Sequence, residues 1–547
     1  MKALSKTKKA TIIFTVLFCI LLFTTQVNAL SLEQTISRRK SVRSYNSDEV
    51  TNKQLLDVLW AAYGESGQRK NVPQIGDAYS LIVYTVNQTG CYRYVPETNS
   101  LTAHNLDINK QDISSYNSGW PSDAKEVLVI VWDSSIADNH YFACAEAGCL
   151  AQNVHLAAAS VDLGTCVVGS IDAEGLSSTL QLPSTQTPLL VMPLGFFTDS
   201  YGAATPKYST MTGNLPKVQI SNVSFEDAIK NMQFTQEWPS ETLSLQQLSQ
   251  LLWAAYGYSS TGHRTTPSAY GIYPLVIYVA NSTGVYKYEP ETHLVSQILQ
   301  TDKRFDVANA FSGQVWAASA PTMIVIGYDS SYNNGNTGDG GVLSHLFMEV
   351  NTGCVVQQIF LEASAQNLKT NILSEGAEEW NGATAQELRS ILGLSNSIIP
   401  LYAIPVGKSE TDLVPPSIGV PSQEPNVDAV EPNQSVKVSV QVTDELGVKE
   451  VVLSFSIDES ETWTNTTMTS SSTNTYIGEI SGFEENTHVK YKISAYDNAN
   501  NYSVQDNAGE YYVYTVFLEF SNLVLVFFVA SILLVVLKAK RNKHKST

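Results

Sequence analysis

Basic residues are scarce in this chain, and several of the few lie at its two ends. The 547 residues include 33 Lys plus Arg against 52 Asp plus Glu, a formal net charge of −19. This balance argues against a nucleic acid as partner, because phosphate backbones are bound by clustered basic side chains. An acidic surface of this kind is typical of a solvated domain outside the cytoplasm.

Cysteine is also rare, which limits both disulfides and metal sites. Five of the six cysteines follow the N-terminal apolar run, an odd number that allows two disulfides at most. Cys144, Cys149, Cys166 and Cys354 lie in apolar surroundings, and no spacing matches a set of metal ligands. We therefore expect small buried side chains here and no metal.

Long apolar runs occur at the two ends of the chain. Four lysines precede residues 12–23, and Val27-Asn28-Ala29 offers small residues for cleavage, so residues 1–29 are predicted to be a signal peptide. An uncleaved anchor is the alternative. Residues 520–537 are long enough to cross ~30 Å of hydrocarbon, and five basic residues follow them.

The basic residues after the second run predict the orientation of the chain, because such residues stay on the cytoplasmic side. We expect a transmembrane helix at 517–538, a basic cytoplasmic tail at 539–547, and a cell-membrane protein with the bulk of the chain outside. A buried core helix is the alternative for this run, and the basic tail disfavours it.

Between these runs the chain contains one sequence twice. Residues 60–64, Trp-Ala-Ala-Tyr-Gly, recur at 253–257, an offset of 253 − 60 = 193. The offset becomes 194 by residue 90, where Gly90 matches Gly284, and later segments drift further, as loop insertions would cause. A repeat of this length is a duplicated domain rather than a solenoid unit. We expect copy 1 at residues 30–220 and copy 2 at residues 221–412.

Each copy has the pattern of an α+β domain. Apolar residues at helical spacing predict helices, and apolar runs joined by turn-forming residues predict strands. The central helix is apolar almost all round, which marks it as buried. In copy 1 the predicted helices are 32–38, 54–63 and 146–161, and the predicted strands are 81–86, 91–95, 127–132 and 189–194; the last strand of copy 2 is 401–406.

After Pro415-Pro416 the pattern changes to alternation of apolar and polar residues. Val436, Val438, Val440 and Val442 alternate with polar side chains, and two later segments do the same. Period-two patterning over about a hundred residues predicts a β-sandwich at 415–516. Its closing segment resembles immunoglobulin-like or fibronectin type III-like modules, and a spacer role is the simplest expectation.

Several motifs in the repeated region resemble those of one known family. Residues 38–45, Arg-Arg-Lys-Ser-Val-Arg-Ser-Tyr, ahead of the helix ending at Gly64, resemble the opening of the nitroreductase family, especially its SagB-type dehydrogenase branch. Residues 264–274 of copy 2 resemble its next block, and residues 146–148 with 168–172 resemble its central helix and flavin-side loop. The resemblance covers roughly residues 31–408.

This resemblance implies an FMN site shared between two subunits, or here between two copies. Family members form homodimers with two FMN molecules at the interface, and each FMN is held by a phosphate clasp of one subunit and a Pro-Ser segment of the other. The implied cofactor-binding residues are Arg39, Lys40, Ser41 and Arg43 in the clasp, Gly169 and Ser170 in the flavin-side loop, and Pro267, Ser268, Ala269, Tyr270 and Gly271 from copy 2. Clustered guanidinium groups and a hydroxyl suit a phosphate.

In register, each copy has lost a different part of this site. Arg39, Ser41 and Arg43 fall opposite Met232, Phe234 and Gln236, which bind a phosphate poorly. The Pro-Ser segment of copy 2 falls opposite Pro-Gln-Ile-Gly-Asp at residues 73–77 of copy 1. The surviving parts belong to the same site, so we expect one FMN per chain and a monomer that is an internal pseudo-dimer.

Some features depart from the family pattern or have simpler explanations. Cys149 and Cys354 stand where the branch often carries His, and Lys207 is only a candidate for the basic residue that closes the clasp. The Arg cluster alone could be a solvated helix end. Tyr270 and Tyr273 could be ordinary aromatic packing. No catalytic side chain can be named.

Two functions follow. The first is an FMN-dependent oxidoreductase, which needs little side-chain chemistry because the flavin carries the hydride; its partners would be a small-molecule or peptide substrate and an unnamed electron donor. The second is a surface binding or scaffold protein on a catalytically retired fold. Its support is location, since FMN and NAD(P)H are cytoplasmic and the leader lacks a twin-arginine pair.

Overall fold

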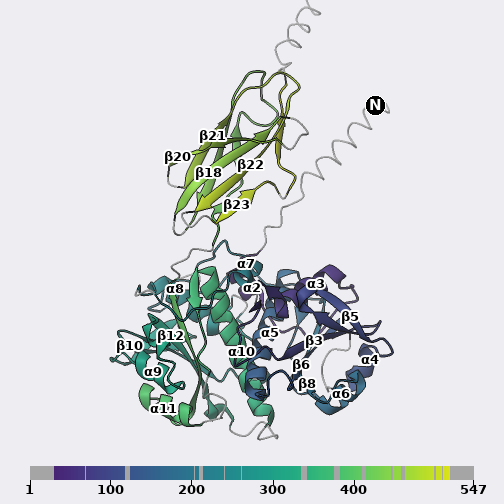
Figure 1. The fold of residues 1–547 in the computed structure, drawn as a ribbon, viewed down its shortest axis with the longest axis vertical. Coiled ribbons are helices and arrows are strands. Elements are labelled where there is room, and N and C mark those ends of the chain that lie inside the picture. The colour runs from purple at the N-terminus through teal and green to yellow at the C-terminus, as the bar shows by residue number, and fades with distance from the viewer. Residues whose placement is uncertain are drawn as a thin grey trace, which may run out of the picture. The chain divides into compact units, whose positions relative to one another are not determined.

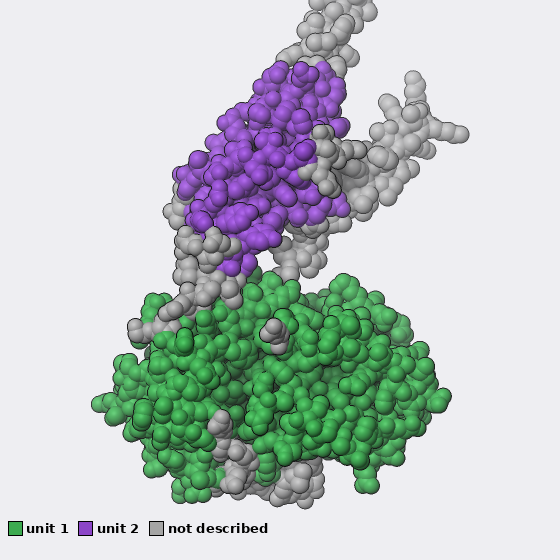
Figure 2. Space-filling model, viewed as in Figure 1, with its two compact units in different colours: residues 1–409 green, residues 410–547 purple. Residues whose placement is uncertain are grey.

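The computed structural model describes residues 30–517, apart from 68, 117–122, 203, 209–212, 239–240, 260–261, 334–341, 375–381, 409–413, 445–446, 458–461, 473, 498–500 and 508. The chain divides into two compact units, residues 1–409 and residues 410–547 (Figure 2). The predicted signal peptide and, from residue 518 on, the predicted membrane span lie outside the described residues. Among the helices that are described, none is both long and apolar enough to cross a membrane.

Unit 1 contains two six-stranded antiparallel sheets with the same strand order. The order is β5-β4-β3-β6-β8-β7 in copy 1 and β11-β10-β9-β12-β14-β13 in copy 2, which confirms two α+β domains in tandem. The elements of copy 1 are α2 (Leu32–Arg38), α3 (Asn52–Tyr63), β1 (Glu65–Ser66), β2 (Arg69–Lys70), β3 (Leu81–Val86), β4 (Cys91–Val95), η1 (Pro96–Thr98), β5 (Ser100–Asn105), α4 (Lys110–Ile113), η2 (Ser114–Tyr116), β6 (Glu126–Asp133), α5 (His140–Ser160), β7 (Gly164–Thr165), α6 (Ala173–Leu180) and β8 (Gln186–Gly195).

Copy 2 repeats this plan with small differences in length. Its elements are α7 (Phe225–Lys230), α8 (Leu245–Tyr256), η3 (Ala269–Gly271), β9 (Leu275–Asn281), β10 (Gly284–Glu289), β11 (Leu294–Leu299), α9 (Arg304–Ala310), η4 (Val315–Ser319), β12 (Thr322–Asp329), η5 (Ser330–Asn333), α10 (Val342–Ala365), β13 (Leu368–Thr370), α11 (Ala383–Leu392) and β14 (Ile398–Lys408). The two copies belong to one compact unit rather than to two separate ones.

The predicted elements of copy 1 are confirmed, with one boundary well off. β3 and β4 match the predicted ranges, whereas α5 begins at His140, six residues before the predicted start at Glu146. The side chain of Asn139 accepts hydrogen bonds from the backbone N–H groups of Tyr141 and Phe142, which caps this end. The apolar pattern that predicted the helix starts only after this polar and aromatic first turn.

The two central helices, α5 and α10, cross in close backbone contact at the centre of unit 1 (Figure 1). The crossing point is Gly148 on α5 and Gly353 on α10. A Cβ atom on Gly148 would lie 2.3 Å from the carbonyl oxygen of Val350, and one on Gly353 would lie 1.9 Å from that of Ala145. Only glycine therefore permits this crossing.

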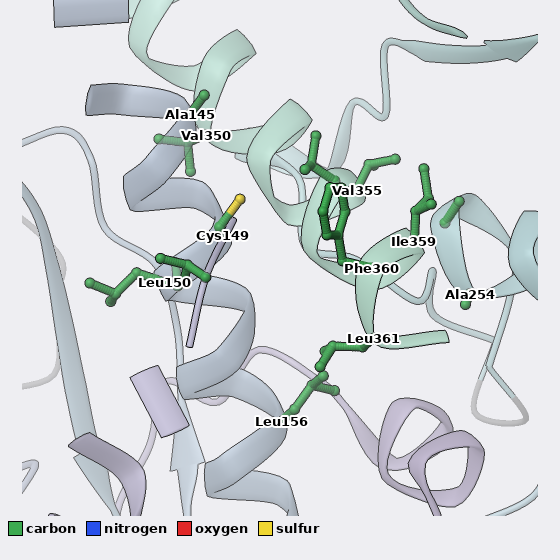
Figure 3. Packing of buried hydrophobic residues seen from close by; sticks show 14 of the residues in the cluster. Ala145, Cys149, Leu150, Leu156, Ala254, Val350, Val355, Ile359, Phe360 and Leu361 are labelled. Atoms are coloured by element: carbon green, nitrogen blue, oxygen red, sulfur yellow. The ribbon is translucent and has the colours of Figure 1, made fainter. Parts of the chain in front are cut away.

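Pseudo-twofold symmetry extends to the neighbouring cysteines. The thiol of Cys149 donates to the carbonyl oxygen of Gly353 at 3.1 Å, and the thiol of Cys354 donates to that of Gly148 at 3.3 Å. Figure 3 shows the side chain of Cys149 on α5 pointing toward Val355 and its neighbours on α10. The described cysteines are all buried and free, which confirms their predicted role as small core residues.

Unit 2 consists of two five-stranded antiparallel sheets around one apolar core. The burial of β17 and β22 alternates along each strand, which confirms the period-two prediction. The strands are β15 (Ser417–Ile418), β16 (Ser422–Glu424), β17 (Val436–Thr443), β18 (Val448–Ser456), β19 (Thr464–Thr467), β20 (Thr469–Ser472), β21 (Thr475–Ile480), β22 (His488–Asp497), β23 (Tyr502–Gln505) and β24 (Tyr512–Thr515).

Candidate functional site

Arg39 carries a buried guanidinium group from copy 1 to the backbone of copy 2. The residue follows α2 and is 2% exposed, and its Nη2 donates to the carbonyl oxygen of Arg264 at 3.1 Å. Its Nε and Nη1 have no hydrogen-bond partner among the described residues. Burial lowers the pKa of Arg39, since the charged form loses its hydration. The alternative of a solvated helix end is wrong for this residue.

Around Arg39 lies a group of buried polar side chains with unused hydrogen-bonding atoms, which we call the polar cradle. It comprises Arg39, Gln152, His155, Thr265 and Thr266. Within the described part of the chain, no partner is found for Gln152 Oε1, either ring nitrogen of His155, or either threonine hydroxyl. Buried polar atoms are normally paired, so such a cluster requires a polar ligand or ordered water.

The cradle is built jointly by the two copies. Gln152 Nε2 donates to the carbonyl oxygen of Thr265 at 3.3 Å, and Gln358 Nε2 of α10 donates to the same oxygen at 3.1 Å. Burial, together with the positive charges of Arg39 and Arg43, lowers the pKa of His155 well below its usual value. His155 is therefore neutral and offers one donor and one acceptor.

The other clasp residues lie at differing depths. Ser41 pairs with Thr165 of β7 in a short parallel bridge, and the Thr165 hydroxyl is buried without a described partner. Arg43 is exposed but close enough to influence His155. Lys40 Nζ donates to the carbonyl oxygen of Ser200 at 3.0 Å, which directs it along the surface.

The flavin-side loop of copy 1 meets copy 2 at an aromatic side chain. Gly169 is buried, and a Cβ atom there would lie 2.8 Å from Cε1 of Phe347 on α10. Ser170 is exposed beside it. The ring of Phe347 also contacts the ring of Tyr270 edge-on, with centroids 5.6 Å apart.

The Pro-Ser segment of copy 2 is held by α10. Ser268 Oγ accepts from Nδ2 of Asn351 at 3.2 Å, and the backbone N–H of Ala269 donates to Oδ1 of the same residue at 3.4 Å. Ser268 Oγ also accepts from the backbone N–H of Tyr273 at 3.1 Å. Pro267 is half-buried at the start of the segment.

Tyr270 and Gly271, at the end of this segment, have left-handed backbone conformations. Their φ angles are 53° and 69°, and the Tyr270 side chain is 71% exposed. A tyrosine in this region is strained by roughly 1 kcal/mol. Because of this exposure Tyr270 is not a core residue, although its ring packs edge-on against Phe347. Tyr273 does pack against the core, beside Tyr256.

The second half-site is filled by apolar side chains. Met232 is 4% exposed, and the ring of Phe234 lies 5.4 Å from the ring of Phe360. Phe360 occupies the position of His155, because the central helices match at an offset of 353 − 148 = 205. The guanidinium group of Arg69 lies over the outer face of Phe234, 5.9 Å from its centroid.

The segment of copy 1 that corresponds to the Pro-Ser segment, residues 73–77, makes hydrogen bonds within itself. Gln74 Nε2 donates to the carbonyl oxygens of Gly76 and Asp77, at 3.1 and 3.0 Å. Beside Met232, Gln357 Oε1 is buried without a partner in the described residues. The polar cradle of the first half-site holds more such atoms, on Arg39, Gln152, His155, Thr265 and Thr266.

Sequence reasoning missed part of the cradle. His155, Thr265 and Thr266 were not among the candidate residues, although the comparison of His155 with Phe360 in register is visible in the sequence. Lys207, the candidate to close the clasp, lies instead 4.1 Å from the ring centroid of Tyr258. No contact in the described residues joins it to Arg39.

Comparison with known proteins gives consistent matches. The profile of the nitroreductase family matches residues 36–196 and 239–408, one range in each copy. A Methanocaldococcus jannaschii protein named as a nitroreductase, MJ1384, is 35% identical over 206 residues, which cover 36% of this chain and 97% of that protein.

One solved structure shows the same fold. A protein of Anabaena variabilis named as a nitroreductase superposes with a TM-score of 0.55 at 18% identity, covering 68% of this chain and 94% of that one. This coverage exceeds a single copy, so the superposition extends over both copies of the fold. An FMN-dependent nitroreductase of Clostridium difficile is 19% identical and covers 31% of this chain and 90% of its own, with a TM-score of 0.23.

Proposed function

The chain belongs to the nitroreductase family, and on this premise we propose that it is an FMN-dependent oxidoreductase with one flavin site per chain. The observation that carries the proposal is the polar cradle. A buried guanidinium group, a neutral histidine and two hydroxyls without described partners suit a ligand that joins a phosphate to a chain of hydroxyl groups. FMN is also the cofactor that the family resemblance of the sequence motifs implies.

The residues divide by the part of FMN that they would hold. Arg39 and Arg43, with Ser41, would bind the phosphate, and His155, Gln152, Thr265 and Thr266 would supply hydrogen bonds beside it. The backbone of Gly169 and Ser170 would approach the reactive edge. Bound FMN would supply hydride transfer.

Phe347 would exclude water from the reactive edge, because its ring lies against Gly169, and the ring of Tyr270 packs edge-on against Phe347. The strain at Tyr270 is consistent with a functional position, since strained conformations persist where the surroundings demand them. SagB-type dehydrogenation, the narrower part of the resemblance, would make a peptide the substrate.

We further propose that the enzyme is anchored by residues 517–538 with both copies outside the cytoplasm. The two apolar runs and the basic tail support this location. Within it, the electron donor must be a molecule other than cytoplasmic NAD(P)H.

The test is a titration of the purified full-length apoprotein with FMN, followed by absorbance and flavin fluorescence. One equivalent is expected. Replacing Arg39 and Arg43 with Ala removes two charge-assisted contacts worth about 1.5–3 kcal/mol each, so affinity should fall by at least about 100-fold.

The matched control places arginines in the second half-site. Met232→Arg with Gln236→Arg should still bind one equivalent, because Phe234 and Phe360 fill the space and Gln74 closes the facing loop. Two equivalents in the natural protein would overturn the half-site assignment. No binding at saturating FMN would favour the scaffold function.

A further inference from the structure

The segment that leads into copy 2 lies across that copy as a bound strap. We define the strap as residues 206–221, described apart from 209–212. Tyr208 is 1% exposed, its ring stacks on His293 with centroids 4.4 Å apart and planes at 9°, and its hydroxyl donates to the carbonyl oxygen of Pro290. The strap is thus anchored by an aromatic side chain at the turn between β10 and β11.

Side chains of copy 2 also bind the backbone of the strap. Gln246 Nε2 donates to the carbonyl oxygen of Lys217 at 3.0 Å. Gln250 Oε1 accepts from the backbone N–H of Gln219 at 2.7 Å, and its Nε2 donates to the carbonyl oxygen of the same residue at 3.0 Å. Copy 2 therefore recognises an extended peptide through an aromatic pocket and backbone hydrogen bonds.

On the corresponding surface of copy 1, no segment among the described residues takes the place of the strap. In register, Pro290 corresponds to Pro96 (290 − 194) and His293 corresponds to Asn99 (293 − 194). Trp253 corresponds to Trp60 (253 − 193). Trp253, under the strap, is 0% exposed, whereas Trp60 is partly exposed. The turn keeps its shape, because Asn99 and His293 have similar left-handed φ angles of 45° and 51°.

Two hollows flank this turn in copy 1. One, of about 450 Å³, is lined by residues that include Lys70, Tyr94, Pro96 and Glu97. Their counterparts in copy 2 include Pro290, whose carbonyl oxygen accepts a hydrogen bond from the Tyr208 hydroxyl, and Arg264 and Glu291, whose charges lie near that hydroxyl.

The other hollow, of about 530 Å³, is lined by residues that include Lys53, Asp57, Trp60 and Asn99. Lys53 and Asp57 correspond to Gln246 and Gln250, the two side chains that bind the strap backbone. The hollows therefore follow the path that the strap takes over copy 2.

The charge of the lining indicates the kind of occupant. In register the strap corresponds to residues 13–28, which lie within the predicted signal peptide and would be absent from the mature chain. The lining of the second hollow includes the charged residues Lys53, Asp57, Glu226 and Lys230, which an apolar occupant would not complement. A polar peptide would complement them. Lys53 Nζ donates to Asp57 Oδ2 at 2.7 Å, and in place of this exposed pair Lys53 can donate to a peptide carbonyl oxygen as Gln246 does, while Asp57 can accept from a peptide N–H group as Gln250 does.

We propose that copy 1 carries a docking groove for an extended polar peptide of another protein, with an aromatic side chain seated beside Pro96. The groove consists of the two hollows and the turn between them. It lies beside the second half-site rather than the polar cradle, so this proposal is independent of FMN binding.

The experiment measures binding of a peptide with the sequence of the strap to the full-length protein in detergent. The probe is a fluorescent synthetic peptide of residues 205–221, followed by anisotropy, and a second peptide carries Tyr208→Ala. We expect one saturable site per chain, with weaker binding of the second peptide.

Lys53→Glu combined with Asp57→Lys exchanges the donor and the acceptor on the groove, and both side chains are exposed enough to tolerate the change. Losing two charge-assisted hydrogen bonds should weaken binding by at least about tenfold. Gln246→Glu, the register partner of Lys53, is the matched control and should leave peptide binding unchanged. Unchanged thermal unfolding will establish that each variant is folded.

Three results would overturn the proposal. The first is the absence of saturable binding up to about 1 mM peptide, which corresponds to a binding free energy weaker than about −4 kcal/mol. The second is equal binding of the peptide by the variant with Lys53→Glu and Asp57→Lys. The third is loss of peptide binding in Gln246→Glu. The last result would show that the peptide displaces the strap from copy 2.

Discussion

His155 and Phe360 occupy the same position on the two central helices, and they give the two half-sites opposite character. His155 is buried with both ring nitrogens unpaired in the described residues, whereas the ring of Phe360 packs against Phe234. One copy therefore keeps an unsatisfied polar group at a position where the other copy has apolar packing. A buried polar group without a partner lowers the stability of the free protein.

His155→Phe should separate ligand binding from stability. Removing the unpaired imidazole should stabilise the FMN-free protein by about 1–3 kcal/mol, while the loss of its hydrogen bond should weaken FMN binding about tenfold. Thermal unfolding with and without FMN measures both. Phe360→His is the matched control, which should destabilise the protein and bind no second FMN. A variant with weaker binding and lower stability would show that His155 is structural.

The crossing of α5 and α10 predicts that replacing its glycines with alanine lowers the stability of the protein, although the same replacement stabilises most helices. Gly→Ala within a helix normally stabilises by about 1 kcal/mol. Gly148→Ala and Gly353→Ala should each destabilise by about 3 kcal/mol or more, because the added methyl group meets a carbonyl oxygen of the opposite helix. Denaturant unfolding monitored by circular dichroism measures the change. Stabilisation by either variant would contradict the described crossing.

Glu349 predicts a pH dependence of stability. This carboxyl group is buried on α10 and accepts a hydrogen bond from the hydroxyl of Tyr402 at 2.8 Å; burial raises its pKa to about 8. The folded state then holds a proton that the unfolded state releases near the ordinary value of 4.5. Its contribution is fully present below pH 4.5 and is lost as the pH rises to about 8, at up to about 1.4 kcal/mol per pH unit.

Glu349→Gln should flatten this dependence, because an amide keeps an acceptor for Tyr402 without a charge. Thermal unfolding from pH 5 to pH 8 measures the slope. Part of the slope should remain, since burial also raises the pKa of Glu146 to about 7. Glu174→Gln, on the exposed surface of α6, is the control. An unchanged slope in Glu349→Gln would refute the assignment.

Most of the fold could be predicted from the sequence because the duplication presents each helix and strand pattern twice. The paired motifs defined the copies, and comparison of Arg39 with Met232 separated the half-sites. The crossing of α5 and α10 could not be predicted, because it depends on which backbone faces Gly148. His155 was missed for the same reason, since its contacts come from segments distant in sequence.

The strap was also beyond sequence reasoning, for a different reason. Tyr208 lies in a linker whose counterpart before copy 1 has an unrelated composition, so no repeated pattern marks it. Its role depends on stacking against His293, a contact between residues 85 positions apart, 293 − 208. Likewise the left-handed conformation of Tyr270 follows from its neighbours, since tyrosine itself disfavours it.

The duplicated architecture predicts a monomer. The two copies pack through α5 and α10 in one compact unit, so the surface through which the resemblance implies dimerisation is already buried within the chain. Light scattering coupled to size-exclusion chromatography, corrected for detergent, should give the mass of one chain. A stable dimer in which copy 1 cross-links to copy 1 of another chain would contradict this expectation.

The predicted orientation in the membrane can be tested on intact cells. If residues 517–538 span the membrane and the basic tail stays inside, both copies and the β-sandwich are exposed to added protease. Immunoblotting with an epitope tag after residue 547 should then reveal a short membrane-bound fragment, whereas a cytoplasmic marker protein remains intact. Exchanging the five basic residues of the tail for Gln and Ser should weaken this orientation, because they carry the inside signal. Full protection of the natural chain in intact cells, with digestion after lysis, would refute export and restore cytoplasmic NAD(P)H as a donor for the flavin.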